Sequence, residues 1–167
     1  MANTIVIGLG NPLLADDGVG LQVAGLLRDC LPPGAGVRVV TAGSGGLGLL
    51  ELMVGYQRAL IIDAMLSGTR APGSVARLAV ASAGPARHLA GSHGGDLAAL
   101  LRLGRSLDLA LPERVELIGI EAAEVDRFAE ELSRSVAAAL PVALSLVREL
   151  LALERPSPWV TGQVDQP

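Results

Sequence analysis

The chain has 167 residues, of which 50% are hydrophobic, 18% are charged and 2% are aromatic, a composition typical of a globular protein with a sizeable core. Its 13 basic residues, all of them arginine, are outnumbered by 17 acidic residues, which gives a formal net charge of −4. Because the chain offers neither a basic field for a phosphate backbone nor a set of aromatic side chains for stacked bases, we expect no nucleic-acid partner.

The first half of the chain predicts strands that alternate with helices. Short apolar runs at 4–7, 37–40 and 59–62 indicate buried strands, and the third of these ends at Asp63. Helical spacing of apolar residues predicts a helix from 19 to 27, with Asp16 or Asp17 placed to cap its first turn. A second helix is expected from about 47 to 54.

The second half continues this alternation. A strand is expected at 74–80, and the short Pro72-Gly73 turn before it favours an antiparallel neighbour. A helix should begin near Gly95 or Asp96, followed by a strand at 114–120. A long helix should then span 132–153, with Ser133 as its cap and a kink or break at Pro141.

We therefore expect a single domain over residues 1–154 and a tail over residues 155–167. The domain should be an α/β structure with a mostly parallel sheet covered on both faces.

Cysteine usage and hydropathy set further limits. Cys30 is the only cysteine, which excludes intrachain disulfides, iron–sulfur clusters and multi-thiolate zinc sites, and we expect it to serve packing. Mean hydropathy is +0.49, yet no uncharged stretch reaches the roughly 18 apolar residues of a spanning helix. We therefore expect a cytoplasmic protein without membrane insertion.

Polar side chains gather where the predicted strands end, which is where ligands bind in such sheets. Carboxylate and imidazole groups converging there would suit zinc, nickel or iron. Each residue also has a structural interpretation: a helix cap for Asp17, a cap or turn for Asp63, and a loop or surface position for each histidine. The polar residues at this edge are Asn11, Asp16, Asp17, Asp63, His88 and His93. Of these, we expect structural roles for Asn11 and Asp16.

Glycines follow the first predicted strand in the run Gly8-Leu9-Gly10. A dinucleotide-binding fingerprint would need a third glycine where Leu13 stands, so we do not expect a nucleotide cofactor. We expect the two glycines to let the loop turn sharply after the strand.

Residues 8–20, with the sequence GLGNPLLADDGVG, strongly resemble the hydrogenase maturation endopeptidases, which process the large subunit of nickel–iron hydrogenases. The resemblance covers roughly residues 3–151. It continues through segments that occur in the same order, namely Thr41-Ala42-Gly43, Ile61-Ile62-Asp63-Ala64, Ser92-His93 and Leu117-Ile118-Gly119-Ile120-Glu121.

The resemblance implies a three-layer α/β/α sandwich with a mostly parallel, mixed five-stranded central sheet. It also implies that Asp17, Asp63 and His93 are both the catalytic and the metal-contacting residues, and that the nickel is supplied by the substrate. The expected reaction removes a C-terminal extension from a nickel-loaded hydrogenase large-subunit precursor, with the substrate nickel as recognition element. Zinc or another divalent ion is the alternative occupant in the isolated protein, which we expect to be a monomer.

Two other functions remain open at this point. Peptidyl-tRNA hydrolases also have a Gly-Leu-Gly-Asn-Pro-like turn after their first strand, but they place a catalytic histidine where this chain has Asp16-Asp17-Gly18. A non-catalytic, metal-responsive binding module is the second alternative, because three ligands alone do not establish proteolysis.

Overall fold

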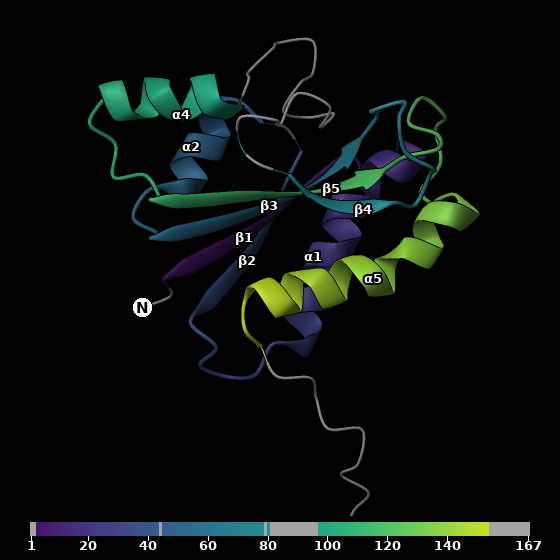
Figure 1. The fold of residues 1–167 in the computed structure, drawn as a ribbon, viewed down its shortest axis with the longest axis horizontal. Coiled ribbons are helices and arrows are strands. Elements are labelled where there is room, and N and C mark those ends of the chain that lie inside the picture. Colours follow the sequence, from purple (N-terminus) through teal and green to yellow (C-terminus); the bar gives the residue numbers. More distant parts are fainter. Residues whose placement is uncertain (1–2, 44, 79, 81–96, 154–167) are drawn as a thin grey trace, which may run out of the picture.

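The computed structural model describes residues 3–43, 45–78, 80 and 97–153. Five strands form one mixed sheet in the order β2-β1-β3-β5-β4 (Figure 1). Their bounds are Thr4–Leu9 for β1, Val37–Ala42 for β2, Arg58–Met65 for β3, Val75–Leu78 for β4 and Arg114–Glu121 for β5. Strand β4 pairs antiparallel with β5 and the other pairs are parallel, which confirms the expected sheet.

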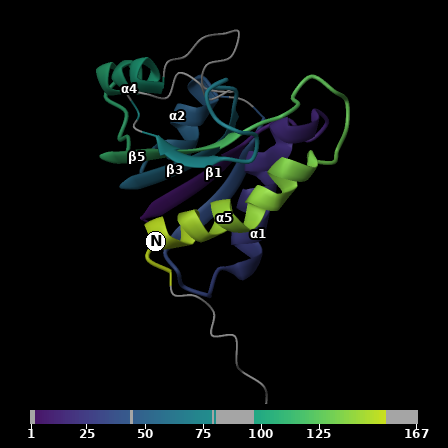
Figure 2. The ribbon, with the colours of Figure 1, turned by 45° about the vertical axis from the view of Figure 1, so that its right-hand side comes forward.

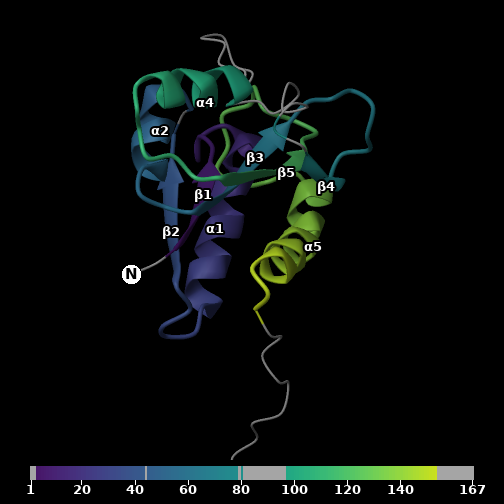
Figure 3. The same cartoon turned by 60° about the vertical axis from the view of Figure 1, so that its left-hand side comes forward.

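Helices cover both faces of this sheet, so the molecule has the three layers that the resemblance implied. Helices α2 (Leu47–Met53) and α4 (Leu97–Ser106) lie on one face. Helices α1 (Val19–Cys30) and α5 (Arg134–Leu150) lie on the other (Figures 1 and 3). None of the helices in the described part of the chain has both the length and the apolar character needed to cross a bilayer.

Alternation along the strands divides the apolar side chains between two cores. Ile5 and Ile7 of β1 pack toward α2 and α4, whereas Val6 between them packs toward α1 and α5. Strand β3 divides in the same way, with Ile61 in the first core and Ile62 in the second. The continuous apolar runs of the sequence therefore mark strands that are buried on both faces.

Several predicted boundaries and caps were wrong. Strands β1, β2 and β3 each continue beyond their predicted ends, so that Asp63 lies inside β3 and is paired in register with Gly119 of β5. Ser133 occupies the N-cap position of α5, but its side chain makes no capping hydrogen bond. Pro141 does not break α5, so of the kink or break expected there only the break is wrong. This residue is on the exposed side of the helix, where water can hydrate the carbonyl that proline leaves without a donor.

Cys30 does not serve packing, contrary to expectation. It is exposed at the end of α1, where its Sγ lies 3.2 Å from Nη1 of Arg148, and its thiol donates to the carbonyl of Leu27. Its position at the last residue of the helix leaves the side chain outside the apolar stripe that faces the sheet.

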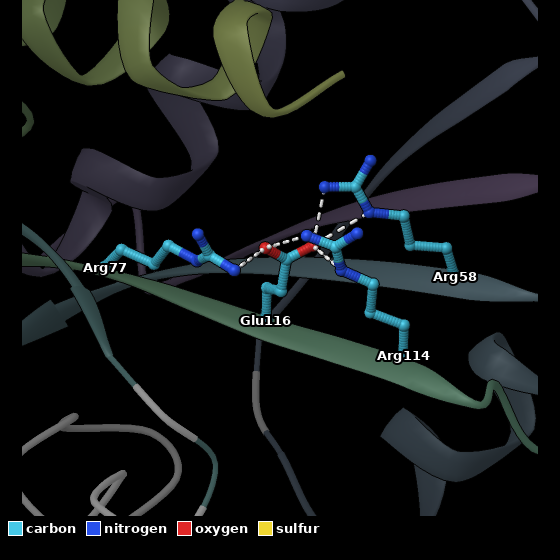
Figure 4. A network of polar contacts seen from close by, with 4 residues as sticks. All are labelled: Arg58, Arg77, Arg114 and Glu116. Carbon is cyan, nitrogen blue, oxygen red and sulfur yellow. Dashed lines mark hydrogen bonds and ion pairs between the residues drawn. The ribbon is translucent and has the colours of Figure 1, made fainter. Parts of the chain in front are cut away.

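A separate polar cluster lies toward the amino ends of the central strands (Figure 4). The buried carboxylate of Glu116 accepts a hydrogen bond of 2.8 Å from Nε of Arg58 and forms ion pairs with Arg77 at 2.8 Å and Arg114 at 3.0 Å. Burial alone would raise the pKa of Glu116. The hydrogen bonds and positive charges of Arg58 and Arg114 outweigh burial and hold this pKa below its ordinary value.

Candidate functional site

The candidate site is built where the start of α1 rests on the carboxyl ends of β1 and β3. Gly20 makes this contact possible, since a Cβ atom there would lie 2.3 Å from the carbonyl oxygen of Leu9 and 2.4 Å from that of Ile62. Gly8 serves the same close packing from within β1, rather than the sharp turn expected of it, because its Cβ would lie 2.3 Å from the carbonyl oxygen of Gly20. The close packing of Gly20 on Ile62 therefore brings the segment that precedes α1 close to Ile62, the residue before Asp63 in the sequence of β3.

Asp17 lies in the short 3-10 helix η1 (Ala15–Gly18), directly before α1. Gly10, at φ 153°, lets the backbone of Asp17 approach β1 closely, since a Cβ at Gly10 would lie 2.2 Å from the Asp17 carbonyl oxygen. The Oδ2 atom of Asp17 accepts a 3.0 Å hydrogen bond from the amide of Asn11. Asp17 is buried and does not cap α1, whose N-cap residue is Gly18 and has no side-chain cap.

Asn11 is structural, as expected. Its side-chain Oδ1 accepts a 3.0 Å hydrogen bond from the amide of Leu13, which closes a tight turn after β1. Asn11 thus shapes the loop with its side chain while its backbone amide holds the carboxylate of Asp17.

Asp63 is fully buried within β3. Two residues after Ile61, it shares the strand face that packs toward α2 and α4. Leu97, the first residue of α4, is buried in the core on this same face. Asp63 therefore faces the layer that contains α2 and α4.

The structure brings two of the three predicted site residues, Asp17 and Asp63, to one edge of the sheet. The third, His93, and the further candidate His88 lie outside the described residues. Among the residues that are described, no group of three or more histidine, cysteine or acidic side chains is placed to hold a metal ion. Both site carboxylates are buried, since Asp17 is 1% exposed and Asp63 is 0% exposed.

Asp16, although adjacent to Asp17, has a different role. Its Oδ2 accepts hydrogen bonds from the amides of Ala123 at 2.9 Å and Glu124 at 3.0 Å. Its Oδ1 accepts one of 2.6 Å from the amide of Ser133 at the start of α5. A buried carboxylate that accepts three amide hydrogen bonds is satisfied, so Asp16 fastens residues 122–133, which we call the β5–α5 loop, to η1.

The same two segments are also joined through their backbones. Ala15 donates a 2.7 Å hydrogen bond to the carbonyl of Ala129, and Asp16 donates one of 3.0 Å to the carbonyl of Glu124. Ala15 adopts φ 45°, in the left-handed region that residues with a side chain rarely occupy. The contacts with the loop hold this strained residue directly before the two acidic residues.

Glu121, at the end of β5, is an anchor that local sequence patterns did not identify. Its Oε1 accepts hydrogen bonds from the amides of Ser67 at 2.9 Å and Gly68 at 3.1 Å, and its Oε2 accepts one of 2.7 Å from the Ser67 hydroxyl. Glu121 thereby fixes the loop that follows β3 and Asp63. The sequence does hold one signal for this role: Glu121 ends an apolar strand, and a buried carboxylate at that position needs hydrogen-bond partners.

These contacts divide the buried acidic residues at the carboxyl edge into two kinds. Asp16 and Glu121 hold loops in place through several amide or hydroxyl donors. Asp17 and Asp63 come from different elements, and their Oδ1 atoms are both buried. A cation that approaches such buried carboxylate oxygens interacts with them strongly, because little water screens their negative charge. The fold and this edge define an α/β protein with a buried acidic pair beside the ends of its central strands.

The comparisons with known proteins agree with this class. The sequence model of the hydrogenase maturation protease family, HycI, matches residues 22–150. The hydrogenase expression/formation protein HupM of Azotobacter chroococcum mcd 1 is 28% identical over 155 residues, which cover 90% of this chain and 72% of HupM.

Solved structures show the same relationship. The hydrogenase maturating endopeptidase HybD from E. coli superposes with a TM-score of 0.76 at 26% identity, covering 90% of this chain and 92% of HybD. The [NiFe] hydrogenase maturation protease HybD from Thermococcus kodakarensis gives a TM-score of 0.69 at 29% identity, covering 89% and 99%.

This chain belongs to the hydrogenase maturation protease family and is an endopeptidase. The family match, over residues 22–150, confirms the family that the resemblance indicated. The same match favours the endopeptidase over the two alternatives, a peptidyl-tRNA hydrolase and a non-catalytic binding module.

Proposed function

We propose that this endopeptidase removes the C-terminal extension of a hydrogenase large-subunit precursor after nickel has been loaded, and that Asp17, Asp63 and His93 contact that nickel. The observation that supports the proposal is that two buried carboxylates, one from η1 and one from β3, lie at the same carboxyl edge of the sheet. Together with one imidazole they would make a donor set of the kind that nickel accepts.

In this proposal the nickel belongs to the substrate and acts as a recognition element. Two carboxylates held in a buried site carry a solvation cost that a divalent ion offsets. A precursor that lacks the ion offers nothing to offset this cost, so it binds poorly. The enzyme therefore distinguishes a loaded precursor from an empty one before any peptide bond is cut.

The nickel also serves as a template for hydrolysis. Held between the two proteins, it fixes the scissile peptide near the acidic pair and polarises its carbonyl or a water molecule. The water oxygen forms a bond to the carbonyl carbon, the carbon–nitrogen bond breaks, and the leaving nitrogen takes a proton. The products are the shortened large subunit and the released extension.

Cleavage of matched precursors tests this function. The wild-type enzyme is incubated with the precursor in its nickel-loaded and nickel-free forms, and the shortened product is quantified by mass spectrometry over time. We expect cleavage of the loaded form and a roughly 100-fold slower reaction of the empty form. A factor of this size is near the top of the range by which one bound ligand changes the affinity for another. Equal rates would rule out nickel as the recognition element.

A further inference from the structure

Two exposed apolar side chains stand beside the candidate site. Phe128, the only phenylalanine of the chain, is 83% exposed, and Leu13 is 51% exposed. Leu13 belongs to the turn that leads into η1, and Phe128 belongs to the β5–α5 loop. Large apolar side chains normally gain free energy by burial, so an exposed pair of this kind next to a site indicates a contact surface.

The backbone holds these two side chains next to each other. Leu14 and Ala129 form a parallel β-bridge, and the amide of Ala129 donates a 3.1 Å hydrogen bond to the carbonyl of Leu13. Leu13 and Phe128 directly precede the two bridged residues, so these two positions lie side by side on the two segments.

The rest of the loop is anchored, which makes the exposure of Phe128 a fixed feature of the surface. Ala122 and Val125 are buried in the core between the sheet and the helices α1 and α5. Asp16 holds the loop amides at both ends of this segment. In Figure 2 the green connection between β5 and α5 passes beside the purple segment that leads into α1. An aromatic side chain on a fixed backbone loses little conformational entropy when a partner covers it.

The charge around Phe128 is acidic. Residues 124–131 carry four carboxylates and one arginine, and that arginine, Arg127, is paired with Glu124 at 2.7 Å. Glu130 and Glu131 follow Phe128 closely and are exposed. Carboxylates at the rim of an apolar contact select partners with basic side chains at the matching positions.

We propose that Leu13 and Phe128 form the surface on which the enzyme holds an apolar side chain of the precursor's C-terminal segment, and that Glu130 and Glu131 favour a segment with an arginine or lysine next to that side chain. The proposal rests on the proposed function, because it takes the hydrogenase large-subunit precursor as the partner. The surface lies on the same edge as Asp17, at the turn that leads directly to this residue. It therefore contributes to binding the polypeptide, separately from the contact with nickel.

Steady-state processing of the nickel-loaded precursor by three variants tests the apolar part of the surface. We expect Phe128→Ala to raise KM about 10- to 30-fold with kcat within twofold of wild type, as for a central contact residue. Phe128→Leu should recover most of this loss. The control is Val142→Ala, which removes a similarly exposed apolar side chain from α5 and should leave both constants unchanged. A KM for Phe128→Ala within twofold of wild type would overturn the proposal.

The acidic part is tested with the double variant Glu130→Arg, Glu131→Arg. We expect kcat/KM to fall several-fold at low salt and to depend less on ionic strength than for the wild type, because attraction between exposed charges is screened by salt. An unchanged salt dependence would remove these two residues from the proposal. Thermal melting of every variant confirms that the fold is intact.

Direct binding of the same precursor separates this proposal from the proposed function. If the wild-type enzyme binds the precursor without shortening it, and Phe128→Ala weakens that binding, the contact surface stands and the proposed function fails. If the wild-type enzyme shortens the precursor and Phe128→Ala does so with an unchanged KM, the proposed function stands and the contact surface fails.

Discussion

Asp16 and Asp17 are adjacent residues of the same type, but their hydrogen-bond partners come from different parts of the chain. The carboxylate of Asp16 is saturated by three backbone amides from the β5–α5 loop. The carboxylate of Asp17 accepts the amide of Asn11 through Oδ2, and its Oδ1 is buried. The partners of the two carboxylates therefore come from different places: Asp16 is held by amides of the distant β5–α5 loop, whereas Asp17 accepts the amide of Asn11 in the preceding turn.

For both candidate ligands, Asp17 and Asp63, we expect substitution to lower activity without lowering stability. Replacement of Asp17 or Asp63 by Asn removes a buried negative charge but keeps the shape of the side chain and one accepting oxygen. We expect each variant to lose more precursor processing than the roughly 10- to 100-fold that the loss of an outer-shell partner costs. We expect the free energy of unfolding to stay within about 1 kcal/mol of wild type or to rise, because the solvation cost of the charge disappears.

Processing assays and thermal melting of the same preparations check this prediction. Asp29→Asn serves as the control, since Asp29 is an exposed residue near the end of α1 and should change neither quantity. Wild-type processing by either site variant would remove that residue from the mechanism.

At the scale of elements, the position of the site depends on how closely α1 approaches the sheet. We expect Gly20→Ala to destabilise the protein by roughly 1–3 kcal/mol, because the added methyl group would collide with the carbonyl oxygens of Leu9 and Ile62. It should also lower processing, since η1 and Asp17 precede this contact directly.

Gly25→Ala provides the matched control within the same helix. A Cβ at Gly25 would meet nothing within 4 Å, so this variant should gain about 0.5–1 kcal/mol from the lower entropy of the unfolded chain. Denaturant unfolding of both variants measures the difference. Equal stabilities would show that the packing of α1 on β1 and β3 tolerates a larger residue.

At the scale of the whole molecule, the two ends of the sheet carry different polar clusters, and the cluster around Glu116 ties stability to pH. The pKa of Glu116 is lowered in the folded protein. Its ionised form therefore stabilises the fold fully above the unfolded-state pKa of about 4.5, and this contribution is lost as the pH falls through the lower folded-state pKa. We expect Glu116→Gln to be less stable than wild type by roughly 2 kcal/mol at neutral pH.

The difference between wild type and Glu116→Gln should shrink steadily as the pH falls below about 4.5. Urea unfolding between pH 3 and pH 7 measures it. Glu113→Gln is the control, because Glu113 is exposed three residues earlier in the chain. A difference that does not depend on pH would show that the charge of Glu116 contributes nothing to stability.

Much of this architecture could be predicted from the sequence, because its signals are local. Apolar runs of strand length and helical spacing gave the order of the elements, and the Pro72-Gly73 turn correctly indicated an antiparallel strand. Asp63 was expected to end β3 because buried carboxylates within strands are rare, and this residue is an exception. The resemblance of residues 8–20 identified the family.

The roles of Asp16 and Glu121 could not be predicted in this way. Their partners lie 53 to 117 residues away along the chain, and no periodic pattern records such a contact. An aspartate before a helix is also the residue type expected of a helix cap, so its type alone does not reveal a long-range anchor. Only the three-dimensional structure distinguishes these two uses of an aspartate.

The hydrogen bonds of Asp16 also bear on when the enzyme becomes competent during its synthesis. The amides that donate hydrogen bonds to Asp16 belong to residues 107 to 117 positions later in the chain, so they are translated after it. A nascent chain that has emerged only as far as β5 cannot yet fasten the segment that carries Asp17. The edge that carries Asp17 is therefore completed only once the chain has emerged from the ribosome beyond Ser133.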